Sequence, residues 1–447
     1  MSKQTIEMEQ ISLAAQTLIE YKTAKLALER RVLEDEKWYK MRHWDVMRTA
    51  ADAGRPEPAS AWLFNVIVNK HADVMDHYPT PEVLPRARDD EKEAKNLSAI
   101  LPAILDRCSF QQKYSDNWWE KLKHGTAIYG AFWNPLLENG RGDVDVRQID
   151  LLNIFWEPEV SDIQQSKNLF IVELAERDAL PDDINDGDLA RFFSDPLGKR
   201  VAVVDWYYKR AGVLHYCKFC GDKVLFSSEN QRGFENGFYA HGRYPVVFDK
   251  LFPEKATPTG FGYISVCKNP QLYIDKLGQN ILEASLMGSR VRYFVSESAN
   301  VNEAEFMDFS KPLVRVAGNI DDSRLRQIQI NPPVPAYLEV YRMKVDEMKE
   351  TSGNRDFNSG GAGNGVTAAA AITAIQTAGG KLSRDMITAA FRAYADIGYL
   401  CVELIRQFYG DKRVFRVNNR DGYSFMDYSN AGMRGSVFDL KIKGVAE

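Results

Sequence analysis

A stretch rich in glycine and asparagine, placed between two amphipathic segments, is the feature that most constrains the fold. Residues 351–371 read TSGNRDFNSGGAGNGVTAAAA, with five glycines and three asparagines. The preceding VPAYLEVYRMKVDEMKE spaces its apolar residues as one face of a short helix. Each glycine disfavours a helix interior by about 1 kcal/mol relative to alanine. The sequence therefore predicts a helix, a loop over 353–366 and a second helix.

The second helix is predicted to be long. From Ser383 to Phe408 apolar residues recur at i, i+3 and i+4 for about seven turns, and Gly410 follows where a helix would end. We assign this helix to the segment 367–410.

A glycine-rich loop that opens a helix could also hold a phosphate group. A P-loop requires GxxxxGK[ST] after a strand, and a dinucleotide site requires GxGxxG after a strand. Here GGAGNG follows a helix, and in the nearby AGGKLS the residue Ile375 replaces the first P-loop glycine while Leu382 replaces the Ser or Thr. We therefore interpret the segment as a mobile or ligand-contacting loop rather than a nucleotide site.

Composition narrows the protein class. The 447 residues suffice for two or three domains or one elongated subunit, and 45% apolar content can supply a core. With 57 basic and 62 acidic residues the net charge is −5, which argues against a protein whose main task is to grip phosphate backbones. The opening MSKQTIEMEQ is polar and no apolar run approaches eighteen residues. We expect neither an export signal nor a membrane-spanning helix.

The cysteines favour reduced thiols over a disulfide framework, because their number is odd and they are widely spaced. They are Cys108, Cys217, Cys220, Cys267 and Cys401. Only YCKFCGDKVLF resembles a metal or redox motif, but it lacks a second Cys pair, and the nearby histidines have no ligand spacing. We predict a β-hairpin turning at Gly221-Asp222, with Cys217 and Phe219 on one face, Cys220 near the turn and no bound metal.

The periodicities predict an α+β chain. Helices are expected over 6–47, 62–77 and 89–124, strands over most of 126–252, and a further helix capped by Asn269 with Pro270 in its first turn. Residues 292–333 should be mixed, with short strands LVRVAG and LRQIQI, and 413–443 should contain the strands RVFRVN and SVFDLKIK.

We find no catalytic signature. GxSxG, HExxH and Walker A motifs are absent from the sequence, and the six histidines are scattered. Three acidic pairs lie in turn-rich surroundings, where solvated carboxylates are usual. They are Asp143/Asp145, Asp182/Asp183 and Asp321/Asp322. The sequence therefore predicts a protein that is not an enzyme and that has no cofactor or metal site.

The order of parts and several local stretches resemble the portal proteins of tailed bacteriophages. EDEKWYKMRHWD is similar to the aromatic end of the family's first helix, and AWLFNVIVNKHADVMDHYPTPEVLP to its helix that runs into a proline-bounded strand. KHGTAIYGAFWNPLLENGRGDVDVRQIDLLNIFWEPEV resembles the wing, and GFGYISVCKNPQLYIDKLGQNIL resembles the start of the first stem helix, including Gly-x-Gly and Gln271.

The resemblance implies an elongated α+β subunit with long stem and wing helices, a β-rich wing and a small α/β clip. The implied segments are 1–125 (N-terminal helical part of the wing), 126–257 (β-rich wing), 258–292 (first stem helix region), 293–333 (clip), 334–352 (second stem helix), 353–366 (tunnel loop), 367–410 (long wing helix) and 411–447 (C-terminal strands towards the crown).

It also implies a ring of about twelve subunits at the capsid vertex of the virion, assembled in the host cytoplasm, through which double-stranded DNA is packaged and ejected. The implied partners are the terminase large subunit, the major capsid and scaffold proteins, and later a head-completion adaptor, with no membrane. The loop residues expected to face DNA are Asn354, Arg355, Phe357, Asn358 and Asn364. The clip residues expected to dock the motor or adaptor are Arg315, Asp321, Asp322, Arg324 and Arg326.

Two alternatives stay open at this point: a nucleic-acid-processing enzyme whose site these motifs miss, and another phage head or neck structural protein. The chain also departs from the family pattern at Glu447, where portals usually continue into a helical crown. The crown is either missing in this protein or encoded beyond the given sequence.

Overall fold

The computed structural model describes most of the chain. The described residues are 6–76, 78–181, 184, 189–193, 195, 198–289, 292–295, 302–306, 325–328, 334–353, 381–419, 422–433 and 435–444.

Helices and strands both contribute to the structure, which confirms the α+β class. The helices are α1 Met8–Tyr39, α2 Trp44–Met47, α3 Trp62–Met75, α4 Glu91–Arg107, α5 Phe110–His124, α6 Leu137–Gly140, α7 Leu189–Phe192, α8 Tyr263–Ser289, α9 Glu303–Phe306, α10 Val334–Ser352 and α12 Lys381–Phe408. The strands are β1 Pro79–Pro85, β2 Thr126–Asn134, β3 Asp143–Gln148, β4 Ile154–Trp156, β5 Asn168–Glu176, β6 Arg200–Arg210, β7 Val213–Cys220, β8 Lys223–Ser227, β9 Val246–Lys250, β10 Phe252–Pro253, β11 Gly260–Phe261, β12 Arg292–Val295, β13 Leu325–Ile328, β14 Arg413–Asn419, β15 Gly422–Tyr428 and β16 Phe438–Gly444.

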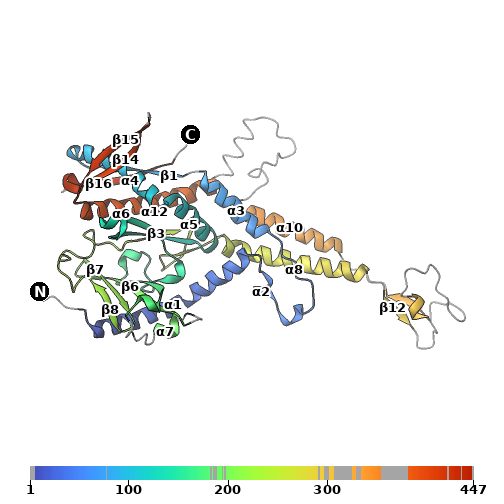
Figure 1. Cartoon of the computed structure of the whole chain (residues 1–447). Coiled ribbons are helices and arrows are strands. Elements are labelled where there is room, and N and C mark those ends of the chain that lie inside the picture. Colours follow the sequence, from blue (N-terminus) through green and yellow to red (C-terminus); the bar gives the residue numbers. More distant parts are fainter. Residues whose placement is uncertain are drawn as a thin grey trace, which may run out of the picture.

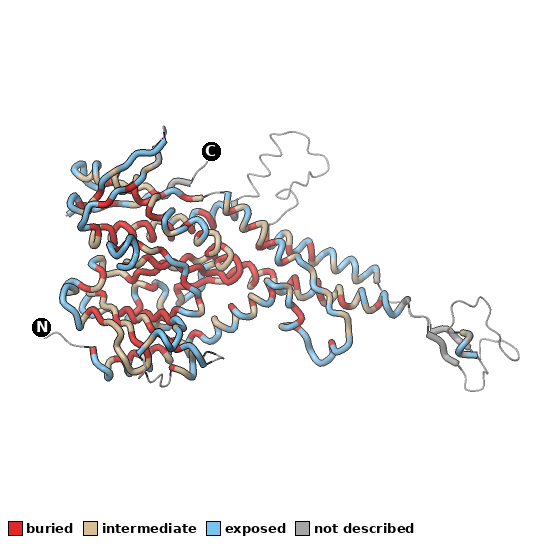
Figure 2. The backbone as a smooth tube through the Cα atoms, viewed as in Figure 1, coloured by how far each residue is buried: buried red, intermediate tan, exposed pale blue. Residues whose placement is uncertain are grey.

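The molecule consists of a broad body and a projecting pair of helices (Figure 1). In the body, a five-stranded antiparallel sheet has the order β4-β5-β6-β7-β8, and a three-stranded sheet has the order β3-β2-β9. Helices α8 and α10 run side by side out of the body, and the β12–β13 pair lies at their far end. Buried residues are concentrated in the body, while the outer parts of α8 and α10 are largely exposed (Figure 2).

Helix α12 forms the centre of the main core. It packs against β2, β9 and β16, and its predicted apolar face is confirmed. The buried members of this face are Met386, Ile387, Ala390, Tyr394, Ile397, Leu400, Cys401 and Leu404, with Phe408 packed at the edge. The strands predicted over 126–252 are confirmed as well, because runs rich in β-branched and aromatic residues, such as RVAVVDWYYKR, form β6 and its neighbours.

The predicted hairpin at Gly221-Asp222 is confirmed by the pairing of β7 with β8. Cys217 and Phe219 are buried in one core cluster, together with residues of α1, and Cys220 is buried in another. Positions an odd number apart in a strand point to opposite faces of the sheet. The two thiols therefore do not converge on a common ligand position.

Three predictions about helices need correction. The segment 89–124 is not one helix but two, α4 and α5, separated at Ser109, whose φ of 52° is left-handed. The segment 6–47 likewise divides into α1 and α2.

The helix predicted to start at Asn269 in fact begins at Tyr263, which places Pro270 in its interior. The missing Pro270 N–H removes one helical hydrogen bond. We attribute the early start to the first turn, where Tyr263, Ile264 and Cys267 are fully buried, because their removal from water favours continuing the helix.

Strands β11, β12 and β15 were not predicted, and β1 was expected only from the portal resemblance. Strand β1 contains three prolines and pairs on one side with β16. Within β1, the Val83 N–H donates to Ser98 Oγ of α4, away from β16. Pro79, Pro81 and Pro85 share the parity of Val83, so the N–H groups they lack would not have bonded to β16.

Candidate functional site

The candidate site is the pair of helices α8 and α10, whose outer part projects from the body. Its root, the first half of α8, is buried in the body. Asp275 and Gln271 are completely buried there. Asp275 Oδ2 lies 2.5 Å from His43 Nδ1, and its Oδ1 accepts from the Ser60 N–H at 2.8 Å and from Gln271 Nε2 at 3.0 Å. The carboxylate of Asp275 therefore binds three separate groups.

The partners of Asp275 are themselves hydrogen-bonded. Gln271 Oε1 accepts from the Leu63 N–H at 2.9 Å, and His43 Nε2 lies 3.0 Å from the Trp38 carbonyl oxygen. Both ring nitrogens of His43 thus face oxygen atoms. This network fixes the root of α8 to the end of α1 and to the start of α3.

The approach to α8 crosses the end of α5 backbone against backbone. A Cβ atom on Gly262 would lie 2.3 Å from the Lys123 carbonyl oxygen, and one on Gly125 would lie 2.1 Å from the Phe261 carbonyl carbon. Both distances are far below contact range, so only glycine fits at these positions. The Gly-x-Gly before the helix therefore serves close packing at the root.

The outer part of the pair exposes apolar side chains on two faces. Leu282 and Leu286 of α8 are exposed, and so are Val340 and Met343 of α10, Met343 to 63%. Leu282 and Leu286 are each two residues from the buried Ala284, and Met343 is two residues from the buried Val345, which places them about 160° around the helix from these buried residues. Each helix thus has an apolar patch on the side away from that buried residue, which we call its far face.

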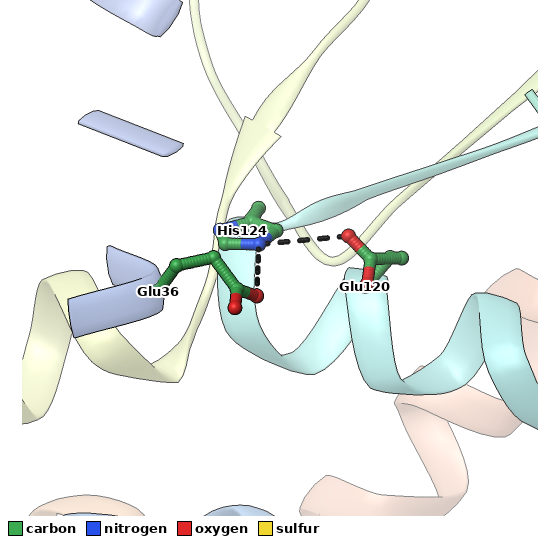
Figure 3. A group of neighbouring side chains, drawn as sticks. All are labelled: Glu36, Glu120 and His124. Carbon is green, nitrogen blue, oxygen red and sulfur yellow. Dashed lines mark hydrogen bonds and ion pairs between the residues drawn. The ribbon is translucent and has the colours of Figure 1, made fainter. Parts of the chain in front are cut away.

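A cluster of charged groups lies where α1 meets the end of α5 (Figure 3). His124 is buried, and its Nε2 lies 3.2 Å from Glu36 Oε1 and 3.5 Å from Glu120 Oε2. Its Nδ1 lies 3.5 Å from Asp35 Oδ2. A histidine with two glutamates is a donor set that could hold a metal ion.

Lysines already supply the positive charge at this cluster. The Lys123 ammonium donates to both Glu36 Oε1 and Glu120 Oε1, and Lys40 Nζ lies 2.8 Å from Glu36 Oε2. The hydrogen bond from His124 is the largest cause that holds the pKa of the Glu36 carboxyl well below its usual range, and the bonds from Lys123 and Lys40 lower it further. We therefore interpret the cluster as an ion-pair junction between α1 and α5, and assign no metal to it.

The model of one protein family matches nearly the whole chain. The family is described as phage P22-like portal protein, and the match covers residues 20–442. The chain belongs to the P22-like phage portal protein family. This confirms the portal resemblance seen in the sequence. Portal proteins are structural head–tail connector proteins of the bacteriophage virion. A search of curated proteins finds no match to the chain.

For this portal family member, most of the predicted site residues lie outside the described part of the chain. These are Asn354, Arg355, Phe357, Asn358 and Asn364 of the loop, and Arg315, Asp321, Asp322 and Arg324 of the clip. Arg326 is placed in β13, where it pairs with Phe294 of β12. The roles predicted for all ten residues stay predictions. Among the described residues, no helix is long and apolar enough to cross a membrane.

The interpretation of the acidic pairs needs one correction. Asp143 is not a solvated turn residue but is buried. It accepts a hydrogen bond from the Tyr409 hydroxyl and lies 3.2 Å from Arg107 Nη1. Its partner Asp145 accepts from Arg147 Nε at 2.6 Å. Asp143 therefore ties β3 to the end of α12. Asp182, Asp183, Asp321 and Asp322 lie outside the described residues.

The residues that position α8 were missed at the sequence level. Gln271 and Asp275 are spaced i, i+4 on a face that is otherwise apolar, with Ile264, Cys267 and Ile274 buried on the same helix. Two polar residues at such positions signal a buried network. The signal does not reveal the partners, because His43 is more than two hundred residues away in the sequence.

The His124 junction predicts a pH dependence of stability. Burial of the ring lowers the pKa of His124, but the nearby carboxylates of Asp35, Glu36 and Glu120 outweigh burial and raise it. A histidine whose pKa is higher in the folded than in the unfolded protein stabilises the fold. This stabilisation is complete below the unfolded pKa of about 6.5 and is lost as the pH rises through the folded pKa. We expect His124→Gln to remove on the order of 1–2 kcal/mol at pH 5.5 and less at pH 9.

The measurement is urea unfolding of both proteins at the two pH values. A free-energy difference that is equal at both, or larger at pH 9, would contradict a charged His124. The exposed pair of Arg42 and Asp45 provides the control, since Arg42→Ala should change stability equally at both pH values.

Proposed function

We propose that this chain assembles into a ring at the capsid vertex and forms the channel through which viral DNA enters and leaves the head. The observation that carries the proposal is the helix pair with apolar patches on its two far faces, Leu282 with Leu286 and Val340 with Met343. Two different patches favour a heterologous, head-to-tail contact, and such contacts close into rings when the rotation permits. Exposed apolar patches of this kind are typical of interaction sites.

In this proposal the helix pair is the stem. Helix α8 lies within 258–292, and α10 spans 334–352. The β12–β13 pair at their far end belongs to the clip, 293–333, which would dock the terminase large subunit during packaging and a head-completion adaptor afterwards. The body supplies the wing, with 1–125, 126–257 and 367–410, and 411–447 leads towards the crown. Assembly would take place in the host cytoplasm with capsid and scaffold proteins.

The charge of the chain suits a channel that lets DNA slide. Every phosphate neutralised by Lys or Arg adds a salt-dependent contribution to DNA affinity. Subunits with a net charge of −5 have no overall excess of such groups. The ring would contain about twelve subunits, as the family resemblance implies.

The tunnel loop, 353–366, would provide the contact with DNA inside the channel. Its polar groups are Asn354, Arg355, Asn358 and Asn364, while Phe357 could pack on a neighbouring loop. We expect replacement of 354–365 by a short Gly-Ser linker to leave ring size and motor docking intact but to reduce the retained genome sharply. The reason is that collective loop contact with DNA is lost while the flanking helices stay packed.

The test is complementation in vivo with this variant, measuring full-length DNA per capsid and ring formation in parallel. Wild-type DNA content would remove the mechanistic role of the loop. Failure to form rings would show that the segment is a packing element. Absence of rings for the unmodified chain on electron microscopy grids would contradict the channel itself.

A further inference from the structure

Helix α8 contains a glycine shortly before it leaves the body. Asp275 and Gln279, on either side of Gly278, are completely buried, whereas Leu282 and Leu286 further along the helix are exposed. Glycine is among the weakest helix formers, because it leaves the backbone free to adopt many conformations. An unsupported helix would bend or open most easily at this point.

The segment 49–60, which we call the strap, contacts α8 on both sides of Gly278. Before the glycine, Lys276 Nζ donates to Asp52 Oδ2 at 2.8 Å. After it, Arg55 Nη2 donates to Asn280 Oδ1 at 2.8 Å and Arg55 Nε donates to Glu283 Oε2 at 2.9 Å.

The strap also passes directly over the glycine. A Cβ atom on Gly278 would lie 3.5 Å from Pro58 Cγ, an ordinary van der Waals distance. The Ser60 N–H then donates to Asp275 Oδ1, which joins the strap to the buried root. Because 3.5 Å is an ordinary contact distance, an alanine at position 278 would fit without displacing the strap.

Polar contacts, rather than apolar burial, hold the strap to the helix. Asp52 is buried and also accepts from the Thr49 N–H at 2.9 Å, and the Lys276 ammonium is the main cause that holds the pKa of Asp52 well below its usual range. Arg55 Nη1 lies 3.7 Å from Asp52 Oδ1. Arg55 therefore contacts two carboxylates, that of Asp52 in the strap and that of Glu283 in α8.

We propose that the strap splints α8 across Gly278, with Arg55 as the positioning residue that keeps the outer half of the helix in line with its buried half. The inference concerns the single chain and does not rest on the proposed ring. It assigns a role to the sequence AGRPEPAS, whose two prolines limit the conformations of the strap itself.

The experiment is hydrogen–deuterium exchange on the full-length protein. We expect Arg55→Ala to speed exchange of the amides of 279–287 by about fivefold, while the amides of α12 are unchanged. Arg42→Ala, which removes an exposed arginine paired with Asp45 outside the strap, should leave both regions unchanged. Adding Gly278→Ala to Arg55→Ala should restore slow exchange, because it strengthens the helix where the splint is missing.

Three results would overturn the proposal. The first is unchanged exchange of 279–287 in Arg55→Ala. The second is faster exchange spread over α12 as well, which would indicate general loss of stability. The third is local acceleration that Gly278→Ala does not reverse, which would place the flexible point elsewhere in the helix.

Discussion

Replacing Leu286 with glutamate should leave the chain folded but prevent ring formation. Leu286 is 49% exposed in the single chain, on the far face of α8 beside Leu282. In the proposed ring this face packs against a neighbouring subunit, and an unpaired carboxylate buried there would cost several kcal/mol at every contact. Because the same contact repeats around the ring, the effect on assembly should be close to complete.

Native mass spectrometry and electron microscopy grids give the measurement, with circular dichroism to verify folding. Leu136→Glu is the matched control, since Leu136 is 83% exposed at the turn before α6 in the body. We expect rings of normal size from that variant. Normal rings from Leu286→Glu would show that this face of α8 is not the interface, and a monomeric unmodified chain would contradict the ring altogether.

Replacing Asp275 with alanine should lower the free energy of unfolding by about 3–5 kcal/mol. The carboxylate accepts from His43, from the Ser60 N–H and from Gln271, all in the buried root of α8. Its removal leaves these donors without an acceptor, and buried unsatisfied groups carry their full desolvation cost.

Asp439→Ala is the matched control for Asp275→Ala. Asp439 lies 2.5 Å from an Arg86 nitrogen, the same distance that separates Asp275 from His43, but both side chains of this pair are more than half exposed. A surface pair of this kind contributes about 0–1 kcal/mol. Equal effects of the two variants in denaturant unfolding at one protein concentration would show that burial of the root network is not what stabilises α8.

Local pattern was sufficient for many elements of the body. Strands β5 to β8 were predictable because RVAVVDWYYKR and its neighbours are short runs rich in β-branched and aromatic residues, separated by turn residues. Helix α12 was predictable because its apolar stripe continues for about seven turns. The sequence pattern failed where packing outweighed a local signal. At the start of α8, burial of Tyr263 and Ile264 makes the helix begin before Pro270 rather than at it.

In the candidate site too, some features were predictable from the sequence and others were not. Sequence pointed to the two helices and the loop between them, and through the family resemblance to a portal, which the match over residues 20–442 confirms. It could not reveal that Asp275 binds His43, that Arg55 reaches Glu283, or that Asp143 is buried against Tyr409, because each pair joins residues more than two hundred positions apart.

The sequence by itself determined the α+β class, the hairpin at Gly221-Asp222 and the amphipathic α12, because helix and strand periods depend on near neighbours. Only the tertiary structure decided that β1 pairs with β16, that glycines at 125 and 262 permit the backbone crossing, and that apolar faces of α8 and α10 remain uncovered. The physical reason is that burial and hydrogen-bond partners depend on segments brought together by the whole fold, and no local pattern encodes which segments meet.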